Sequence, residues 1–216
     1  LGKWCRRAKV QHYFEICNTE LSGYLRLSEK TTSLSGVSHD TAKFFMKAPD
    51  NNMLQFILSN KIILVEGDAE FILMEAMYKN TTNKELANSG IGVIAVDGKC
   101  FKRYLEIAQL IDIKVAVITD NDRDYNNNVV NNYREYVAGN IKVFSDDNNE
   151  RYTFEVCIYN DNATILDDEF GNLRTNTPLQ YMLANKAEAA FRILESHANE
   201  IVVPQYIQDA IEWIEK

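Results

Sequence analysis

From Lys61 onward the sequence alternates short, continuous apolar runs with segments in which apolar residues recur at helical spacing. The apolar runs cover 62–65, 92–96, 115–118 and 141–144, and the helical patterns between them cover 71–77, 101–110 and 129–137. Strands that are apolar on both faces, with helices between them, are typical of a mainly parallel sheet covered on both sides. The sequence therefore predicts an α/β fold built on such a sheet, followed by a C-terminal helical extension.

Residues 1–59 lack this rhythm. Apolar residues between 13 and 27 indicate one or two short helices. A loop rich in Ser, Thr and Gly follows at 31–40, and a second apolar stretch, 44–58, is interrupted at Pro49. We expect residues 1–59 to be the end of a preceding domain, or connecting helices, and residues 60–216 to form one domain. Because the chain begins with Leu1 and not with Met, we expect it to be part of a longer protein.

The charge and the cysteines limit the class of function. The formal net charge is −8, which argues against a nucleic-acid partner unless the acids gather around divalent cations that reverse the local sign. No apolar run approaches the roughly 20 residues of a membrane helix, so we expect no membrane partner. The 4 cysteines form no Cys-x-x-Cys pair, which predicts reduced thiols in a cytoplasmic protein.

Acidic residues follow the first apolar run, in the sequence LVEGDAE. Glu66 ends the strand, and Glu70 falls in the first turn of the following helix. Functional groups of parallel sheets collect beyond the carboxyl ends of the strands, so both carboxylates can face one small volume. We expect Gly67 to let the helix begin without crowding that volume. For Asp68 the better interpretation is that it offsets the helix dipole.

A second acidic cluster follows the third run, in the sequence VAVITDNDRD. Alternate side chains of an extended chain point the same way, so we expect Asp120 and Asp122 to project together. Neighbouring carboxylates repel one another and raise a pKa, whereas an oxygen-only pair suits Mg²⁺ or Mn²⁺. The alternative is a polar turn after a strand. Asp97 and Asp124 are candidates for supporting acids outside the predicted ligand set. For Lys99 the better interpretation is a solvated lysine, and the alternative is a phosphate contact.

Together the two clusters resemble the Toprim domain, the metal-binding fold of topoisomerases, bacterial primases and nucleases of the OLD (overcoming lysogenization defect) family. Toprim proteins carry a Glu after the first strand and Asp-x-Asp after a later one; here these are Glu66, Asp120 and Asp122. LVEGDAE is similar to the LVEG-x-x-E motif of the OLD branch, which adds Glu70. The resemblance covers about residues 60–216.

Two later elements resemble the same family more loosely. Thr153-Phe154-Glu155 resembles its Thr-Leu-Glu element, and Asn185-Lys186 with Ala190 resembles its lysine-bearing helix. The segment YTFEVCIY alternates like a strand, so the alternative for Glu155 is an ordinary solvent-facing residue. For Lys186 we predict one helix that starts at Thr177 and Pro178 and runs to about Ser196, aiming the ammonium at the acids. The alternative is a lysine that packs its stem and snorkels to water.

The resemblance implies a metal-dependent DNA endonuclease domain. Phosphodiester cleavage fits two Mg²⁺ or Mn²⁺ ions roughly 3.5–4 Å apart. We predict five metal ligands and three catalytic residues; the ligands are Glu66, Glu70, Asp120, Asp122 and Glu155, and the catalytic residues are Glu66, Asp120 and Lys186.

The expected partners are DNA, an ATPase region of the full-length protein and further copies of the chain. The sequence contains no G-x-x-x-x-G-K-[ST] phosphate loop. Many OLD-type proteins are implicated in defence against phage. Two alternatives stay open: a non-catalytic DNA-docking or oligomerisation module, and a phosphotransferase with Asp120 as nucleophile, which Arg123 and Asp124 disfavour because they depart from the D-x-D-x-T pattern.

Overall fold

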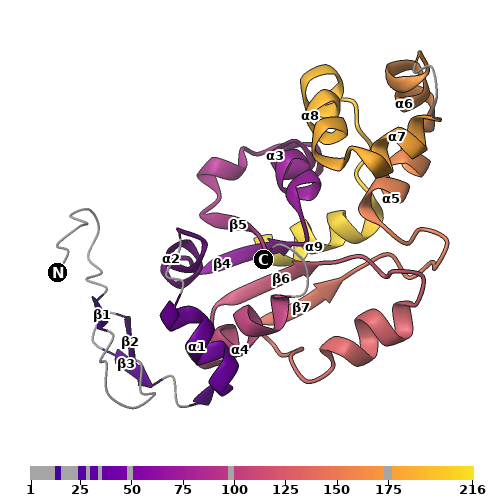
Figure 1. Cartoon of the computed structure of the whole chain (residues 1–216). Helices are drawn as coiled ribbons and strands as arrows, with labels where there is room; N and C mark the ends of the chain where they lie inside the picture. Colours follow the sequence, from indigo (N-terminus) through magenta and orange to yellow (C-terminus); the bar gives the residue numbers. More distant parts are fainter. Residues whose placement is uncertain are drawn as a thin grey trace.

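The computed structural model describes the backbone of residues 13–15, 24–27 and 30–33, and then residues 36–47, 51–96, 100–172 and 177–216. Its centre is a parallel sheet of four strands in the order β5-β4-β6-β7 (Figure 1). The strands are β4 (Lys61–Val65), β5 (Ile91–Ala95), β6 (Lys114–Ile118) and β7 (Ile141–Phe144). These are the four apolar runs of the sequence, and the predicted parallel sheet is confirmed.

The two faces of the sheet carry separate apolar clusters because successive strand residues point to opposite sides. Along β4, Ile63 and Val65 contribute to one cluster, whereas Ile62 and Leu64 contribute to the other. All four side chains are fully buried. This burial on both faces explains why the strands read as continuous apolar runs in the sequence.

Helices cover both faces. On one face lie α3 (Asp68–Thr82) and α9 (Gln205–Glu215). On the other lie α1 (His39–Lys47), α2 (Asn51–Leu58) and α4 (Phe101–Ile111). Phe45 and Phe56 share the cluster of this second face, so α1 and α2 pack directly on the sheet. The proposed domain boundary at residue 59 stays a prediction.

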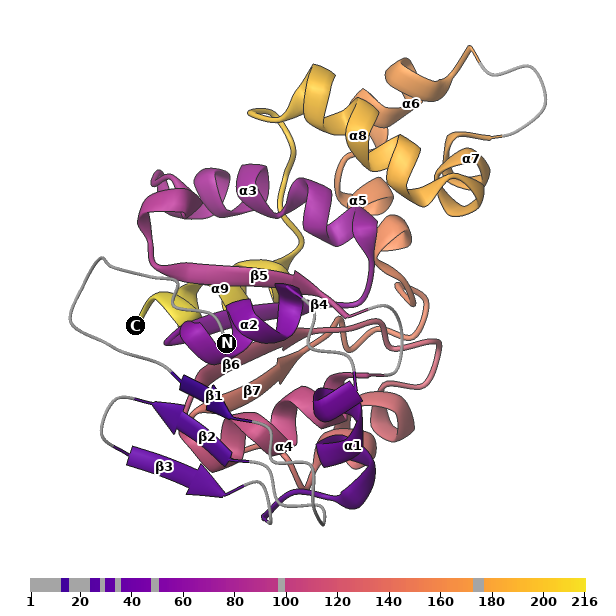
Figure 2. The same ribbon diagram turned by 60° about the vertical axis from the view of Figure 1, so that its left-hand side comes forward.

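A group of four helices forms the predicted C-terminal extension. They are α5 (Phe154–Asp161), α6 (Ala163–Phe170), α7 (Pro178–Ala184) and α8 (Lys186–His197). Figure 2 shows them beyond α3, on the side away from α1 and α4, and α8 packs along α3. The chain then returns to the sheet through α9. None of the helices in the described part of the chain combines the length and the apolar character of a membrane span.

The expected helices between residues 13 and 27 are wrong. The chain there forms an antiparallel sheet of β1 (Tyr13–Glu15), β2 (Tyr24–Leu27) and β3 (Lys30–Ser33), in which Leu27 pairs with Lys30. Short apolar runs do not distinguish a strand from a helix by periodicity alone. The helical pattern at 129–137 is also only partly realised, because a π-helical turn spans Asn126–Asn131.

Candidate metal site

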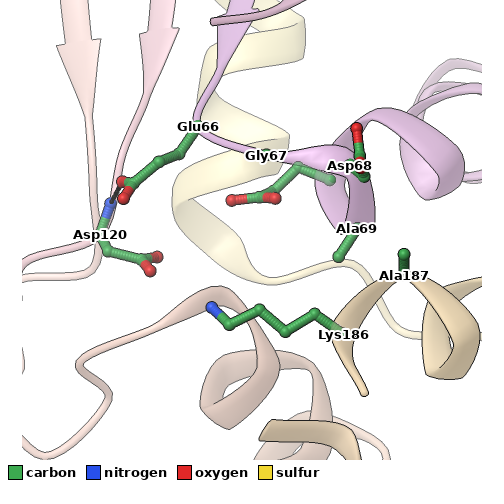
Figure 3. Close-up of a pocket in the computed structure, with 8 residues that line it drawn as sticks. Glu66, Gly67, Asp68, Ala69, Asp120, Lys186 and Ala187 are labelled. Carbon is green, nitrogen blue, oxygen red and sulfur yellow. Dashed lines mark hydrogen bonds between the residues drawn. The ribbon is translucent and has the colours of Figure 1, made fainter. Parts of the chain in front are cut away.

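A cavity of about 440 Å³ lies where β4 and β6 end. Its lining combines acidic residues, small residues and one lysine (Figure 3): Glu66, Gly67, Asp68, Ala69, Glu70, Asp120, Lys186 and Ala187. The residues come from the ends of β4 and β6, the start of α3 and the start of α8. The two strands are hydrogen-bonded neighbours, so the sheet itself brings the two acidic clusters of the sequence together.

Glu66 is held by the end of the neighbouring strand. Its Oε2 accepts a hydrogen bond from the Thr119 hydroxyl at 3.3 Å. The same atom accepts one from the Asp120 backbone N–H at 3.4 Å, which Figure 3 shows. Thr119 in turn hydrogen-bonds the side chain of buried Tyr133. Glu66 therefore sits at a defined place beside Asp120.

Asp120 connects the sheet to α5. Its Oδ1 accepts a hydrogen bond from the Phe154 N–H at 2.8 Å, one of the first amides of α5 and so without an acceptor inside the helix. Burial raises the pKa of Asp120 to about 8, and the negative charges of Glu66, Glu70 and Glu155 add to this effect. Metal-free Asp120 therefore binds a proton near neutral pH.

Glu70 is the third residue of α3 and only 6% exposed. Burial raises its pKa to about 7 against the effect of a backbone hydrogen bond, and the charges of Glu155 and Glu66 raise it further. Asp68 lies in the first turn of the same helix, where a carboxylate offsets the helix dipole.

Glu155 lies in a helix, so the expected strand is wrong. Thr153 caps α5 by accepting a hydrogen bond from the Val156 N–H, and Glu155 falls in the first turn with 3% of its surface exposed. The alternation of YTFEVCIY does not mark a buried and an exposed face, because residues 154–158 are all buried in the helix. The carboxylate does not face solvent; its Oε2 lies 3.0 Å from the Lys186 Nζ.

Lys186 begins a helix of its own. The Thr177–Pro178 start is confirmed, with a reciprocal capping box to Gln180. The single helix to residue 196 is wrong, because α7 ends at Ala184 and α8 begins at Lys186, on either side of Asn185. This break places the lysine at a helix start that faces the cavity.

The Lys186 amine points into the acidic cavity, toward Asp120 (Figure 3). Its side chain is 51% exposed. Burial lowers the pKa of the amine, but the hydrogen bond and charge of Glu155, with the charges of Asp120 and Glu70, outweigh this and raise it. Lys186 is therefore an ammonium at neutral pH, and the alternative of an amine that only snorkels to water does not describe this contact.

Asp122 does not project alongside Asp120 in the way that an extended chain would place it. The strand ends at Ile118, and Asp122 and Arg123 adopt left-handed φ values of 49° and 68°. Asp122 is exposed and is not among the residues that line the cavity. The reasoning from strand alternation was therefore wrong, because the chain turns at this point; the metal role of Asp122 stays a prediction.

Gly67 does not have the steric role expected of it. Its backbone is extended, at φ −147°, and an added Cβ would meet Glu70 Oε2 at an ordinary 3.5 Å. Of the supporting residues, Asp124 accepts hydrogen bonds from the backbone and side chain of Asn127. Asp97 and Lys99 lie outside the described residues.

The oxygen donors of the site are of the type that divalent ions prefer, but they are not already arranged around one ion position. Three acids, Glu70, Asp120 and Glu155, interact with the Lys186 ammonium. Glu66 adds its charge to those of Glu70 and Asp120. Oxygen-only donors suit Mg²⁺ or Mn²⁺, and added positive charge would relieve the crowding that raises two of the pKa values. Over the described stretches, no three Asp, Glu, His or Cys side chains are already grouped as ligands of one ion.

Sequence reasoning missed three contributors to this site. Thr119 orients Glu66, the Phe154 amide holds Asp120, and Asn121 is 1% exposed between the two aspartates. The signal for Asn121 was its place just after Thr119 and Asp120 at the end of a strand, where Asn commonly forms turns through its side chain. The other two contacts depend on residues that are distant in the sequence.

A parallel sheet with a glutamate after one strand and an aspartate after its neighbour defines a Toprim-type domain. Residues 57–122 match the family model for the Toprim domain of overcoming lysogenization defect protein-like proteins. Over these residues the chain is similar to an OLD-like Toprim domain.

Relatives agree with this assignment. A stretch of 73 residues, 33% of this chain, is 34% identical to the Old nuclease of Escherichia phage P2 and spans 12% of that protein. The C-terminal region of the Burkholderia pseudomallei OLD protein is 20% identical with a TM-score of 0.57, covering 73% of this chain and 97% of that one. The corresponding region from Xanthomonas campestris pv. campestris is 23% identical with a TM-score of 0.52, covering 74% and 94%. At these identities the structural likeness shows the fold.

Proposed function

We propose that this chain contains a divalent-metal-dependent DNA endonuclease domain. The observation that carries the proposal is the convergence of Glu66, Glu70 and Asp120 on one cavity that also receives the Lys186 ammonium. The similarity to the Old nuclease of phage P2 supports the same reaction class. Glu155 contributes through its contact with Lys186.

Each residue has a task that follows from its place. Glu66, Glu70 and Asp120 would hold Mg²⁺ or Mn²⁺, with Asp122 and Glu155 as further proposed ligands. The ions, when bound, supply positive charge against the phosphate and activate water. The Lys186 ammonium adds a positive charge to that of the ions, and it would stabilise negative charge that develops on the phosphate. Glu155 holds the lysine ready, 3.0 Å away.

One observation favours a second candidate, a Toprim-like module that docks DNA or other copies without cleaving. Within the described ranges no ready-made group of three metal ligands is present. The two candidates differ in one measurement. Incubation with supercoiled plasmid and Mn²⁺ should give nicked product with the parent and none with Glu66→Ala, whereas a docking module gives none with either.

The proposed setting is a longer protein. The solved relatives are C-terminal regions of OLD proteins, which supports an ATPase region as a partner in the same full-length chain. The proposed substrate is DNA, and the proposed assembly is a homo-oligomer. We place the protein in the cytoplasm, in accord with the free thiols of Cys100 and Cys157. A role in phage defence is tested by plating phage on cells with the full-length parent or its Glu66→Ala variant; equal plating on both would exclude a nuclease-dependent role.

A further inference from the structure

Asn121, the middle residue of the Asp-Asn-Asp motif, contacts the long connection between β7 and α5. Its side-chain Nδ2 donates to the backbone carbonyls of Asp146 at 2.8 Å, Asn148 at 3.0 Å and Arg151 at 3.3 Å. Its Oδ1 accepts from the Arg123 N–H at 2.8 Å. Asn121 is 1% exposed, so its side chain is shielded from water.

This connection leads directly into α5. Within it, Arg151 binds Asp146 through its Nε and Asp161, at the end of α5, through both terminal nitrogens. The Asp122 N–H also donates to the Tyr152 carbonyl at 3.1 Å. The turn after β6 and the segment before α5 are therefore connected by one backbone hydrogen bond and by three hydrogen bonds from the Asn121 side chain.

These hydrogen bonds affect the positions of Phe154 and Glu155, two residues that contact the site. Phe154 and Glu155 follow the connection immediately, and the Phe154 amide holds Asp120 while Glu155 holds Lys186. If the connection moved, Asp120 would lose its backbone donor and Glu155 would move away from the lysine. One buried amide thus sets the spacing between the β6 and α5 sides of the cavity.

We propose that Asn121 is a positioning residue of the metal site, which keeps Asp120 and Glu155 at the spacing that metal binding requires. The proposal rests on the proposed metal-dependent function. Residues that orient metal ligands typically change metal affinity 10–100-fold when substituted.

The test substitution is Asn121→Asp. Aspartate has the same shape and keeps the acceptor for Arg123, but an oxygen replaces the Nδ2 group and faces three carbonyls. The added negative charge would by itself strengthen cation binding. Weaker binding of Mn²⁺ would therefore report displaced ligands and not altered charge.

Asn162→Asp is the matched control. Asn162 is also buried, its Nδ2 donates to the Ile158 and Val202 carbonyls, and its Oδ1 accepts from the Val202 N–H. It belongs to the far end of α5 and does not line the cavity. Loss of fold stability is common to both variants, whereas loss of the site geometry is expected only for Asn121→Asp.

Two measurements on the chain carry the test. Titration calorimetry with Mn²⁺ should show at least tenfold weaker binding for Asn121→Asp and an unchanged affinity for Asn162→Asp. Amide exchange in the metal-free protein should show at least tenfold faster exchange at Phe154 in Asn121→Asp, relative to the amides of β4 and β6. That amide has no acceptor within its helix, so its protection reports the Asp120 contact.

The proposal is overturned if folded Asn121→Asp keeps the Mn²⁺ affinity and the Phe154 amide exchange rate of the parent. It is also overturned if Asn162→Asp changes these two quantities as much as Asn121→Asp does. If Asn121→Asp does not fold, Asn121→Ser is judged by the same criteria. If the parent itself binds no Mn²⁺, the proposed function fails, and Phe154 exchange alone then decides whether Asn121 positions Asp120.

Discussion

The Lys186 ammonium lies 3.0 Å from the carboxylate of Glu155, a half-exposed cation beside an anion that is 3% exposed. The two residues come from the first turns of α8 and α5, neither of which belongs to the sheet that carries Glu66 and Asp120. The candidate site is thus built by two layers, with the sheet providing acids and the helical extension providing the cation and one more acid.

The first prediction concerns this pair. Lys186→Met keeps an apolar stem but removes the charge, so we expect plasmid nicking to fall roughly a hundredfold or more while Mn²⁺ binding persists. It also leaves Glu155 buried without its partner, which should cost roughly 1–3 kcal/mol of the free energy of unfolding. Nicking rates, calorimetry and urea unfolding measure the three effects.

Two further variants separate catalysis from stability. Lys186→Met combined with Glu155→Gln should recover most of the lost stability without recovering nicking. Lys79→Met, at an exposed pair with Glu85, should leave nicking unchanged. If Lys186→Met cleaves like the parent, the lysine has no role in turnover.

The second prediction is that Glu66→Ala and Asp120→Ala each abolish nicking while the circular dichroism spectrum stays that of the parent. Each variant removes a carboxylate that has no replacement among the residues lining the cavity at the same strand end. Retention of metal-dependent nicking by either variant would contradict the two-metal assignment.

The third prediction concerns pH and stability without metal. Burial first, and then neighbouring acids, raise the pKa of Asp120 from an ordinary 3.8 to about 8. The folded state therefore binds this proton more tightly than the unfolded state, and stability falls as pH rises from about 4 to about 8. Asp120→Asn keeps an acceptor for the Phe154 amide and removes this loss, so we expect it to be more stable than the metal-free parent at pH 8, by on the order of 1–3 kcal/mol.

Urea unfolding at pH 5 and pH 8 measures this difference, which should be larger at pH 8. Adding Mn²⁺ should reduce the difference in the free energy of unfolding between Asp120→Asn and the parent at pH 8, because the ion stabilises the parent alone. If Asp120→Asn is no more stable than the metal-free parent at either pH value, then the charged form of Asp120 does not destabilise the folded state.

The fourth prediction is that the chain cleaves DNA slowly and with little sequence preference. Its formal net charge of −8 gives little long-range attraction to a polyanion, so positioning of DNA should depend on other parts of the full-length protein. Binding to plasmid and to short duplexes of different sequence, measured at physiological salt, should be weak and similar. Tight binding to one sequence would show that this chain recognises DNA by itself.

The sequence by itself determined the parallel sheet and the two strand-end acids. A strand buried on both faces needs a continuous apolar run, which is a local pattern. The carboxyl ends of parallel strands meet at one edge, so Glu66 and Asp120 had to lie close together once β4 and β6 were neighbours. The match to the LVEG-x-x-E motif pointed to the same place.

Only the tertiary structure decided the rest of the site. YTFEVCIY became largely a helix, and Tyr13–Glu15 and Tyr24–Leu27 became strands, because short apolar runs take their form from the partners they pack against. The turn that carries Asp122 away from Asp120 is held by Tyr152, Asn121 and the connection before α5. The Glu155–Lys186 and Phe154–Asp120 contacts join residues about 30 positions apart; such contacts follow from how helices pack and leave no local pattern in the chain.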